Sequence, residues 1–328
     1  MDVIIEFKKS LKIYFDDIQE GIWFKSLHPY LSEASLEAIT GATIRNTKLQ
    51  GVLKYDRPDI ILTFDGNPIL VLERTIEVPS GHNVGQRFAR LAAAAEARVP
   101  LVYFGPYVAR KHGGATEGPR YMNLRLFKAL DIMQDINNSA ITTINWPVDS
   151  KSEILQDPSK DNRVREYLKM FFEFFIKLGP KDVHKAIIES KFQAQQLLER
   201  KEFIKNKVTK PEQYDNPPDS VTISDTKTFF KSTGIDTPSF PYDQIVLYHV
   251  GMTYVRSDPY TGMALLYRYL YIAKSQGKTC LILRFPNITK EMWNVVAYSG
   301  KERKDVRIYK TVADGILFKD DFVVRGKL

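Results

Sequence analysis

The sequence contains one cysteine, Cys280, which excludes an internal disulfide and favours a reducing compartment. No cluster of cysteine and histidine has the spacing of a zinc site. No apolar run reaches the roughly 18 residues that a membrane span needs, and the N-terminus lacks the basic start and apolar run of a signal peptide. These absences predict a soluble, cytoplasmic protein that has no membrane partner.

Two further absences narrow the choice of function. The glycine-rich stretch at 113–118 is not followed by Gly-Lys-Ser/Thr, so it is not a phosphate-binding loop. There is no repeat of solenoid period and no low-complexity tract. What is present is a chain of 328 residues, 44% hydrophobic, with a formal net charge of +8. This basic bias is compatible with nucleic-acid binding but does not establish it.

The hydrophobic pattern predicts an α/β protein with a mixed central sheet flanked by helices. Residues 3–39 have apolar positions at helical spacing. Two apolar runs, 59–64 and 68–78, are separated by an Asp-Gly turn, which is the strongest short-range signal of a β-hairpin. Strong helix formers fill 83–97, and an apolar run between prolines at 100–106 indicates a buried strand.

The remaining chain divides at a proline-rich stretch near residue 210. Before it we expect a helix at 120–134, a strand at 141–148, and helices at 162–178 and 181–206. After it, strands and helices alternate again. We therefore predict three parts, which are a core domain over 1–148, a helical connector over 149–207, and a C-terminal α/β part over 208–328.

The predicted hairpin carries two acidic residues inside apolar runs. If its turn centres on Gly66, residues whose numbers add up to 132 stand opposite each other, and Asp59 then faces Glu73. Because side chains alternate along a strand, Thr75 and Glu77 share the face of Glu73. Ionised carboxylates are costly to bury, and they repel each other unless a cation lies between them.

A hard divalent cation removes this conflict. Two carboxylates on a rigid frame, completed by waters and a substrate phosphate, suit Mg²⁺, which generates a hydroxide beside a phosphodiester. The alternative is that one carboxylate lies exposed at a sheet edge or pairs with Arg57 or Arg74.

The order Pro58-Asp59, then Glu73-Arg74-Thr75 at the end of the next apolar strand, resembles the PD-(D/E)XK nucleases, the restriction-endonuclease-like superfamily. The pattern is most like a type II restriction endonuclease and covers roughly residues 30–106. The resemblance implies a nuclease core domain and an Mg²⁺-dependent endodeoxyribonuclease, with Asp59 and Glu73 as catalytic metal ligands.

Three more acidic residues are candidates under this resemblance. In that family a glutamate on the preceding helix often joins the two ligands, and Glu37 fits this role, with Glu33 as the second choice. Glu77 is a candidate ligand for a second ion, or else a solvated strand end.

Thr75 departs from the family pattern, because it stands where the family carries a lysine that positions the attacking water and balances charge. Three interpretations remain open. Thr75 suffices with a nearby base, or a cation such as Lys54, Arg74 or Arg87 takes the place of the lysine, or the site is inactive and the protein only binds DNA.

Basic residues outside the hairpin are candidates for DNA contact. Gln86 and Arg87 lie near the start of the helix behind the site, where some relatives carry a glutamine and, four residues later, a tyrosine that is Arg90 here. A flexible loop over 107–125 mixes basic and aromatic residues, as DNA-contacting loops do. The candidate DNA-binding residues are Gln86, Arg87, Arg110, Lys111, Arg120 and Arg256.

The C-terminal stretch 312–327 repeats the hairpin pattern, with Asp314 in the place of Asp59. With its turn centred on Asp320, Asp314 would face Gly326, which offers no second carboxylate, so we expect an ordinary hairpin there. One chain therefore offers one good site, and cutting both strands of DNA predicts a homodimer on double-stranded DNA. The alternatives are a repair or phage-defence nuclease of the same fold, or an inactive DNA-binding protein on that scaffold.

Overall fold

The structure is a computed structural model that describes residues 7–8, 10–76, 79, 81–113, 117–235, 240–251, 258–298 and 303–327. Within helices, the side chains of 81–84, 86, 258–259 and 296–298 are outside this description. The chain forms two compact units, each described below by itself. The first comprises Met1–Asn83, Ala89–Asn123 and Met133–Thr209, and the second Val84–Phe88, Leu124–Ile132 and Lys210–Leu328.

The first unit is built on a six-stranded mixed sheet in the order β2-β1-β3-β4-β5-β8. Its central strands β1, β3 and β4 are antiparallel, and β4, β5 and β8 are parallel to one another. The strand bounds are β1 Leu11–Phe15, β2 Ser35–Ala38, β3 Ile60–Phe64, β4 Asn67–Arg74, β5 Leu101–Gly105 and β8 Ile141–Asn145.

The helical prediction for 3–39 is wrong over the described residues from 10 onward. This segment forms β1, the helix α2 (Ile18–Lys25), a short 3₁₀ turn and the edge strand β2. Asp17 caps α2 by accepting a hydrogen bond from the Gln19 N–H, which ends the strand and starts the helix. The helix α3 (Gly41–Ile44) follows.

The predicted β3–β4 hairpin is confirmed. Asp65 and Gly66 both have positive φ, 49° and 75°, which is the two-residue turn that Asp-Gly favours. Phe64 pairs with Asn67 beside the turn. A register shift between Leu62 and Thr63 then moves the pairing by one residue, so that Ile60 lies opposite Leu72. Beyond the shift, the residue numbers of each pair add up to 132 as predicted (60 and 72, 61 and 71).

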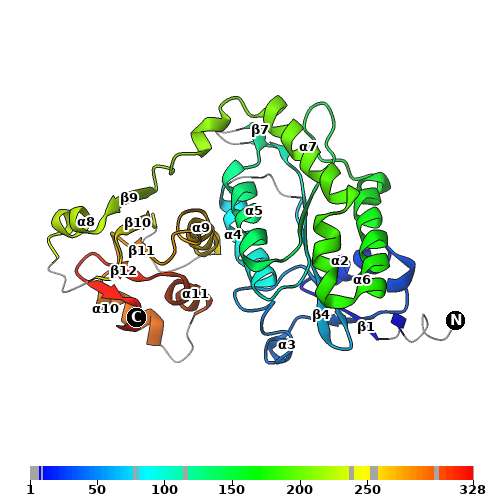
Figure 1. The fold of residues 1–328 in the computed structure, drawn as a ribbon, viewed down its shortest axis with the longest axis horizontal. Helices are drawn as coiled ribbons and strands as arrows, with labels where there is room; N and C mark the ends of the chain where they lie inside the picture. Colours follow the sequence, from blue (N-terminus) through cyan, green and yellow to red (C-terminus); the bar gives the residue numbers. More distant parts are fainter. Residues whose placement is uncertain are drawn as a thin grey trace. The chain divides into compact units, whose positions relative to one another are not determined.

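One face of this sheet carries the large core of the first unit. Leu62, Leu70 and Leu72 lie in one apolar cluster with side chains of α2 and α6. Helices α2, α6 (Asn162–Ile188) and α7 (Lys191–Lys207) lie together in this unit (Figure 1). Residues 149–207, predicted as a connector, therefore contribute to the core of the first unit.

The predicted break between helices at 162–178 and 181–206 coincides with a kink at Gly179, but the structure has a second break, at Glu189 and Ser190, that was not predicted. Helix α6 continues to Ile188 across a kink at Gly179, whose φ of 76° and ψ of 179° are not helical. Pro180 follows this residue. A glycine at this backbone conformation lets the second half of α6 change direction, and α7 then starts at a new cap, Ser190.

Two further helices and a small hairpin follow the sheet strands. The predicted helices at 83–97 and 120–134 correspond to α4 (Gly81–Glu96) and α5 (Leu124–Asn137). The predicted flexible loop over 107–125 instead contains a two-stranded antiparallel hairpin. Its strands are β6 Val108–Lys111 and β7 Gly118–Tyr121.

The second unit contains a five-stranded sheet in the order β13-β12-β11-β10-β9. Strands β10, β11 and β12 are parallel, and the edge strands β9 and β13 run antiparallel to them. The bounds are β9 Val221–Asp225, β10 Gln244–His249, β11 Thr279–Arg284, β12 Gly315–Leu317 and β13 Phe322–Val324. The helices are α8 Thr226–Thr233, α9 Asp258–Tyr271, α10 Lys290–Tyr298 and α11 Lys304–Val312.

The C-terminal hairpin has a different register from the predicted one. Leu317 pairs with Phe322, so residue numbers add up to 639 and Asp314 falls opposite Arg325. The Asp314 side chain is buried, and ion pairs join it to Arg325 at 3.2 Å and to Arg268 at 3.0 Å. Asp314 therefore has its own counter-ions, as expected of an ordinary hairpin.

The two mixed sheets with their helices confirm the α/β class. Among the described residues, no helix has both the length and the apolar character to cross a membrane.

Candidate active site

Asp59 and Glu73 come together where β3 begins and β4 ends. The Asp59 N–H donates to Glu73 Oε2 at 3.4 Å, and Asp59 Oδ2 accepts the Arg74 N–H at 2.7 Å. The predicted opposition of the two carboxylates is therefore present. The Glu73 side chain is 0% exposed and the Asp59 side chain is 17% exposed, so the pair is reached from solvent on the Asp59 side.

The cation between the two carboxylates is Arg90 of helix α4. Its Nη1 donates to Glu73 Oε1 at 2.9 Å and to Asp59 Oδ1 at 3.2 Å. Its Nε donates to Asp56 Oδ2 at 3.2 Å. Burial by itself would lower the pKa of Arg90, but the carboxylates of Glu73, Asp56 and Asp59 outweigh it and raise that pKa, so the guanidinium stays charged.

The neighbouring Arg74 points to the other side of the sheet. Its Nη1 lies 2.9 Å from both carboxylate oxygens of Glu20 on α2. Its guanidinium carbon also lies 4.3 Å from the ring centre of Trp23 and 5.0 Å from that of Trp146. Side chains alternate along β4, so Arg74 contributes only its backbone N–H to the carboxylate pair.

Thr75 lies directly after β4 and is 5% exposed. Its N–H donates to the Phe104 carbonyl at 2.9 Å, which extends the pairing of β4 with β5 by one residue. A Cβ at Gly105 would come within 2.5 Å of Thr75 Cγ2, so the glycine is required for this close approach. The lysine position of the family pattern is thus held by a buried threonine.

Lys54 also has its own partner. Its Nζ lies 2.7 Å from Glu96 Oε2 near the end of α4, and Tyr55 donates to the same carboxylate. The cation beside Asp59 and Glu73 is therefore Arg90, which the sequence analysis noted only as a departure from the family pattern.

Glu37 does not join the carboxylate pair. It lies on the edge strand β2, not on a helix, and two strands separate β2 from β4 in the sheet. At about 4.8 Å per strand, this separation is on the order of 14 Å. Its side chain is 47% exposed and forms an ion pair with Lys12 at 2.9 Å. Glu33 is likewise exposed, with Lys8 at 3.9 Å. Glu77 lies outside the described residues.

The donor set of the site suits a small hard cation. Asp59 Oδ1 and Glu73 Oε1 converge on the single Nη1 atom of Arg90, so both oxygens are already aimed at one positive centre. In the described part of the chain, no group of three or more histidine, cysteine, aspartate or glutamate side chains is arranged for a metal ion. Two carboxylate oxygens with several waters is a coordination that Mg²⁺ accepts. A metal ion therefore fits between these two oxygens only when the Arg90 guanidinium moves away from them.

The basic residues of the β6–β7 hairpin divide between its two faces. Ala109 pairs with Arg120 and Lys111 with Gly118, so Lys111 and Arg120 are diagonal neighbours on one face. Arg110 lies on the other face, where its Nε is 3.7 Å from Glu153. The structure thus brings Lys111 and Arg120 together and separates Arg110 from them.

The remaining DNA-binding candidates are only partly described. Arg87 lies half-buried on α4. Gln86 is on the same helix, but its side chain is outside the description, and Arg256 lies outside the described residues altogether.

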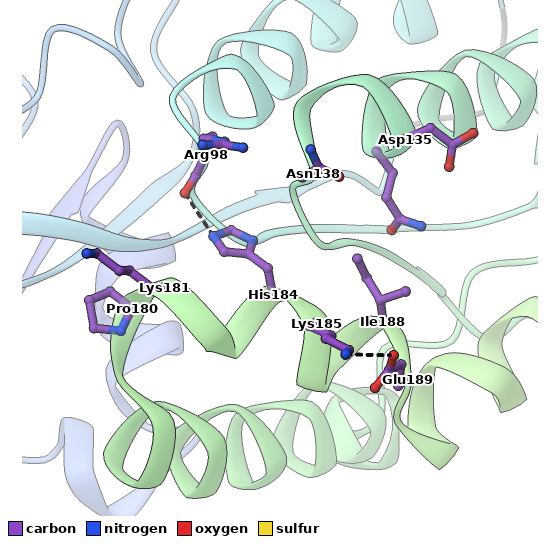
Figure 2. Close-up of a pocket in the computed structure, with 10 residues that line it drawn as sticks. Arg98, Asp135, Asn138, Pro180, Lys181, His184, Lys185, Ile188 and Glu189 are labelled. Carbon is purple, nitrogen blue, oxygen red and sulfur yellow. Dashed lines mark hydrogen bonds and ion pairs between the residues drawn. The ribbon is translucent and has the colours of Figure 1, made fainter.

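Figure 2 shows a cavity of about 740 Å³ in the first unit, and none of the residues that line it is a predicted site residue. His184 of α6 is one of the residues that line this cavity. Its Nε2 lies 2.9 Å from the Arg98 carbonyl oxygen, and its Nδ1 accepts a hydrogen bond from the Ala140 N–H at 3.0 Å. With both ring nitrogens engaged by backbone, the imidazole is neutral, and burial lowers its pKa. This histidine joins α6 to the sheet.

A smaller cavity of about 400 Å³ belongs to the second unit. It is lined by Leu247, Arg284 and Leu317, which lie at the carboxyl ends of the parallel strands β10, β11 and β12, and by Lys319. This edge of a parallel sheet is where α/β proteins commonly bind ligands. Arg284 and Lys319 are exposed, and neither forms an ion pair with any described residue.

Sequence reasoning missed Asp56 and the central role of Arg90. A signal for Arg90 existed, because two buried carboxylates require a cation and α4 carries two arginines one turn apart, Arg87 and Arg90. The sequence gave no means to choose between them.

Comparison of the chain with protein-family models, with curated proteins and with solved structures finds no match. The functional argument therefore depends on the geometry of the residues themselves.

Proposed function

We propose that this chain is an Mg²⁺-dependent endodeoxyribonuclease of the PD-(D/E)XK type that hydrolyses phosphodiester bonds, with sequence-specific restriction as its role. The observation that carries the proposal is the convergence of Asp59 Oδ1 and Glu73 Oε1 on one cation. The surrounding strand order supports it, since β4 of the antiparallel β3–β4 hairpin also pairs in parallel with β5, which follows helix α4.

In this proposal Asp59 and Glu73 hold the metal ion, and the backbone fixes their orientation. The Arg74 N–H holds Asp59 Oδ2, and the Asp59 N–H holds Glu73 Oε2. The two other oxygens, Oδ1 and Oε1, then face the position of the ion. An Mg²⁺ ion held by these two residues would supply a hydroxide nucleophile and would stabilise the charge that develops on the phosphate. Thr75, two residues after Glu73, supplies a hydroxyl but no charge.

Contacts to the DNA backbone are proposed for cations in both units. In the first unit, Lys111 and Arg120 share one face of the β6–β7 hairpin. In the second, Arg284 at the end of β11 and Lys319, just after β12, line one cavity and have no acidic partners among the described residues. Lysine and arginine side chains bind phosphates by charge and position the protein on the duplex.

A second candidate function is DNA binding without cleavage on the same scaffold. Two observations favour it. Arg90 lies where the metal ion would bind, and Thr75 stands in place of the lysine of the family pattern.

One experiment separates the two functions. The purified protein is incubated with unmethylated phage DNA in 10 mM-range Mg²⁺ or in excess EDTA, and the fragment ends are sequenced. Discrete fragments with uniform ends in Mg²⁺ alone support the restriction-type nuclease. Intact DNA that is nevertheless retarded in a gel-shift assay supports the non-catalytic function.

A further inference from the structure

Arg90 occupies the two oxygens that the proposed metal ion needs. The backbone N–H groups of Asp59 and Arg74 already hold one oxygen of each carboxylate. The oxygens aimed away from these donors, Asp59 Oδ1 and Glu73 Oε1, are the two that bind Arg90 Nη1. A metal ion bound to the same two oxygens would share one small space with the guanidinium, and two cations at such a distance repel strongly.

We infer that Arg90 and the divalent metal ion compete for this carboxylate pair, so that Arg90 acts as an internal counter-ion which the metal displaces. The inference rests on the proposed function. The new element is that Arg90, and not the two carboxylates alone, limits the affinity of the site for the metal ion.

Asp56 keeps Arg90 bound when the metal ion displaces it from the other two carboxylates. It binds Arg90 through Nε, whereas the two metal-binding carboxylates are both bound through Nη1. A rotation of the guanidinium group therefore breaks the two Nη1 contacts and keeps the contact with Asp56. Arg90 is 15% exposed and Asp56 is 11% exposed, so the exchange takes place at the solvent-facing edge of the site.

The competition is tested by measuring the affinity for Mn²⁺ alone, without DNA, by isothermal titration calorimetry. Arg90→Gln removes the internal cation and should bind Mn²⁺ at least about tenfold more tightly than the parent protein, a difference of about 1.4 kcal/mol. The gain should disappear in Arg90→Gln combined with Glu73→Gln, because the metal then loses one of its two oxygens.

The matched control is Arg268→Gln, which removes an arginine from the buried Asp314 in the second unit. A single carboxylate offers no site for the ion, so Mn²⁺ affinity should stay at the parent value. If Arg90→Gln fails to fold, Arg90→Lys is used instead. It keeps a positive charge beside Glu73 but loses the forked donors of the guanidinium, so the metal should displace it more easily and Mn²⁺ affinity should rise about threefold.

Each result decides the inference. Tighter Mn²⁺ binding by Arg90→Gln or Arg90→Lys supports the competition, whether or not the parent cleaves DNA. Equal or weaker binding by both variants overturns it, and cleavage by the parent in Mg²⁺ then still supports the proposed function. If neither the parent protein nor any variant binds Mn²⁺, both the competition and the proposed function are overturned.

Discussion

Glu73 has no exposed surface, yet its carboxylate lies beside a second carboxylate. Arg90 makes this arrangement stable because it bonds to Glu73, Asp59 and Asp56 together. A buried charge that loses its partner is far more costly than an exposed one. The stability of the site therefore depends on one arginine.

We predict that Arg90→Ala lowers the free energy of unfolding of the first unit by about 3–5 kcal/mol, because three carboxylates lose the guanidinium that they share. Arg90→Lys keeps the charge but loses the forked donors, so it should cost less. Urea unfolding followed by tryptophan fluorescence measures both, since Trp23 and Trp146 lie in the first unit. A parent-like Arg90→Ala variant would mean that Arg90 does not hold the carboxylates in solution.

The sequence predicts the carboxylates of this site better than their cation. Asp59 and Glu73 are neighbours across a hairpin, so a local register brings them together. Arg90 comes 17 residues after Glu73 on a helix, and the packing of α4 on the sheet determines which of its side chains reaches the site. Glu37 was misplaced because its assignment required a helix that the chain does not form.

Helix α6 shows how one glycine directs a long element. Gly179 has φ 76° and ψ 179°, a region that only glycine adopts readily. A Cβ built on it meets no atom within 4 Å, so a substitution is opposed by the backbone and not by packing.

We predict that Gly179→Ala destabilises the first unit by about 1–3 kcal/mol despite the open space around it. The matched control is Gly41→Ala in α3, where a Cβ also meets nothing within 4 Å but φ is not positive. That variant should be neutral or slightly stabilising. Equal stability of the two variants in urea unfolding would argue against the kink.

Two histidines of the first unit make its stability depend on pH. Burial lowers the pKa of His184 and of His28 in the folded protein, so the unfolded chain binds protons more readily. Their contribution is complete above the ordinary histidine pKa of about 6.5 and is lost as the pH falls below it, toward the lowered folded value. His184 carries it because a proton on Nδ1 would end its bond with the Ala140 N–H.

The expected slope from one histidine is at most about 1.4 kcal/mol of unfolding free energy per pH unit, with stability falling toward acid. Urea unfolding of the parent between pH 7.5 and pH 5.0, in roughly half-unit steps, measures it. His184→Gln cannot titrate there and should show a shallower slope. Parallel slopes would show that His184 does not contribute.

Elements with strong local signals were predicted correctly, and short ones were not. The Asp-Gly turn predicted the β3–β4 hairpin, and an uninterrupted apolar run predicted β5. The segment 3–39 failed because a five-residue strand, an eight-residue helix and a four-residue strand together produce apolar spacing that resembles one longer helix. Whether such a segment forms strands depends on its pairing with strands far away in the sequence, and hydrophobic periodicity contains no information about that pairing.

The chain as a whole is basic, with a net charge of +8. The cations proposed for DNA contact lie in both units, on the β6–β7 hairpin and at the carboxyl edge of the second sheet. Binding to DNA through several of them would release a corresponding number of counterions.

We predict that DNA affinity falls steeply with salt, with a log–log slope close to −0.9 per phosphate contact. Changing Arg284 and Lys319 together to alanine should make the slope shallower by about 1–2. Fluorescence anisotropy in Ca²⁺ over a salt series measures it. A slope near zero for the parent would contradict any role in DNA binding, and an unchanged slope in the variant would contradict the second-unit contacts.

The most direct test of the account is the rate of plasmid cleavage in Mg²⁺ by the parent, Asp59→Asn and Glu37→Gln. If Asp59 and Glu73 hold the ion, Asp59→Asn should cut at least about a hundredfold more slowly, because the metal supplies several kcal/mol of transition-state stabilisation. Glu37→Gln should cut at the parent rate, since Glu37 lies on the exposed edge strand. Parent-rate cleavage by Asp59→Asn, or loss of cleavage only in Glu37→Gln, would contradict the site.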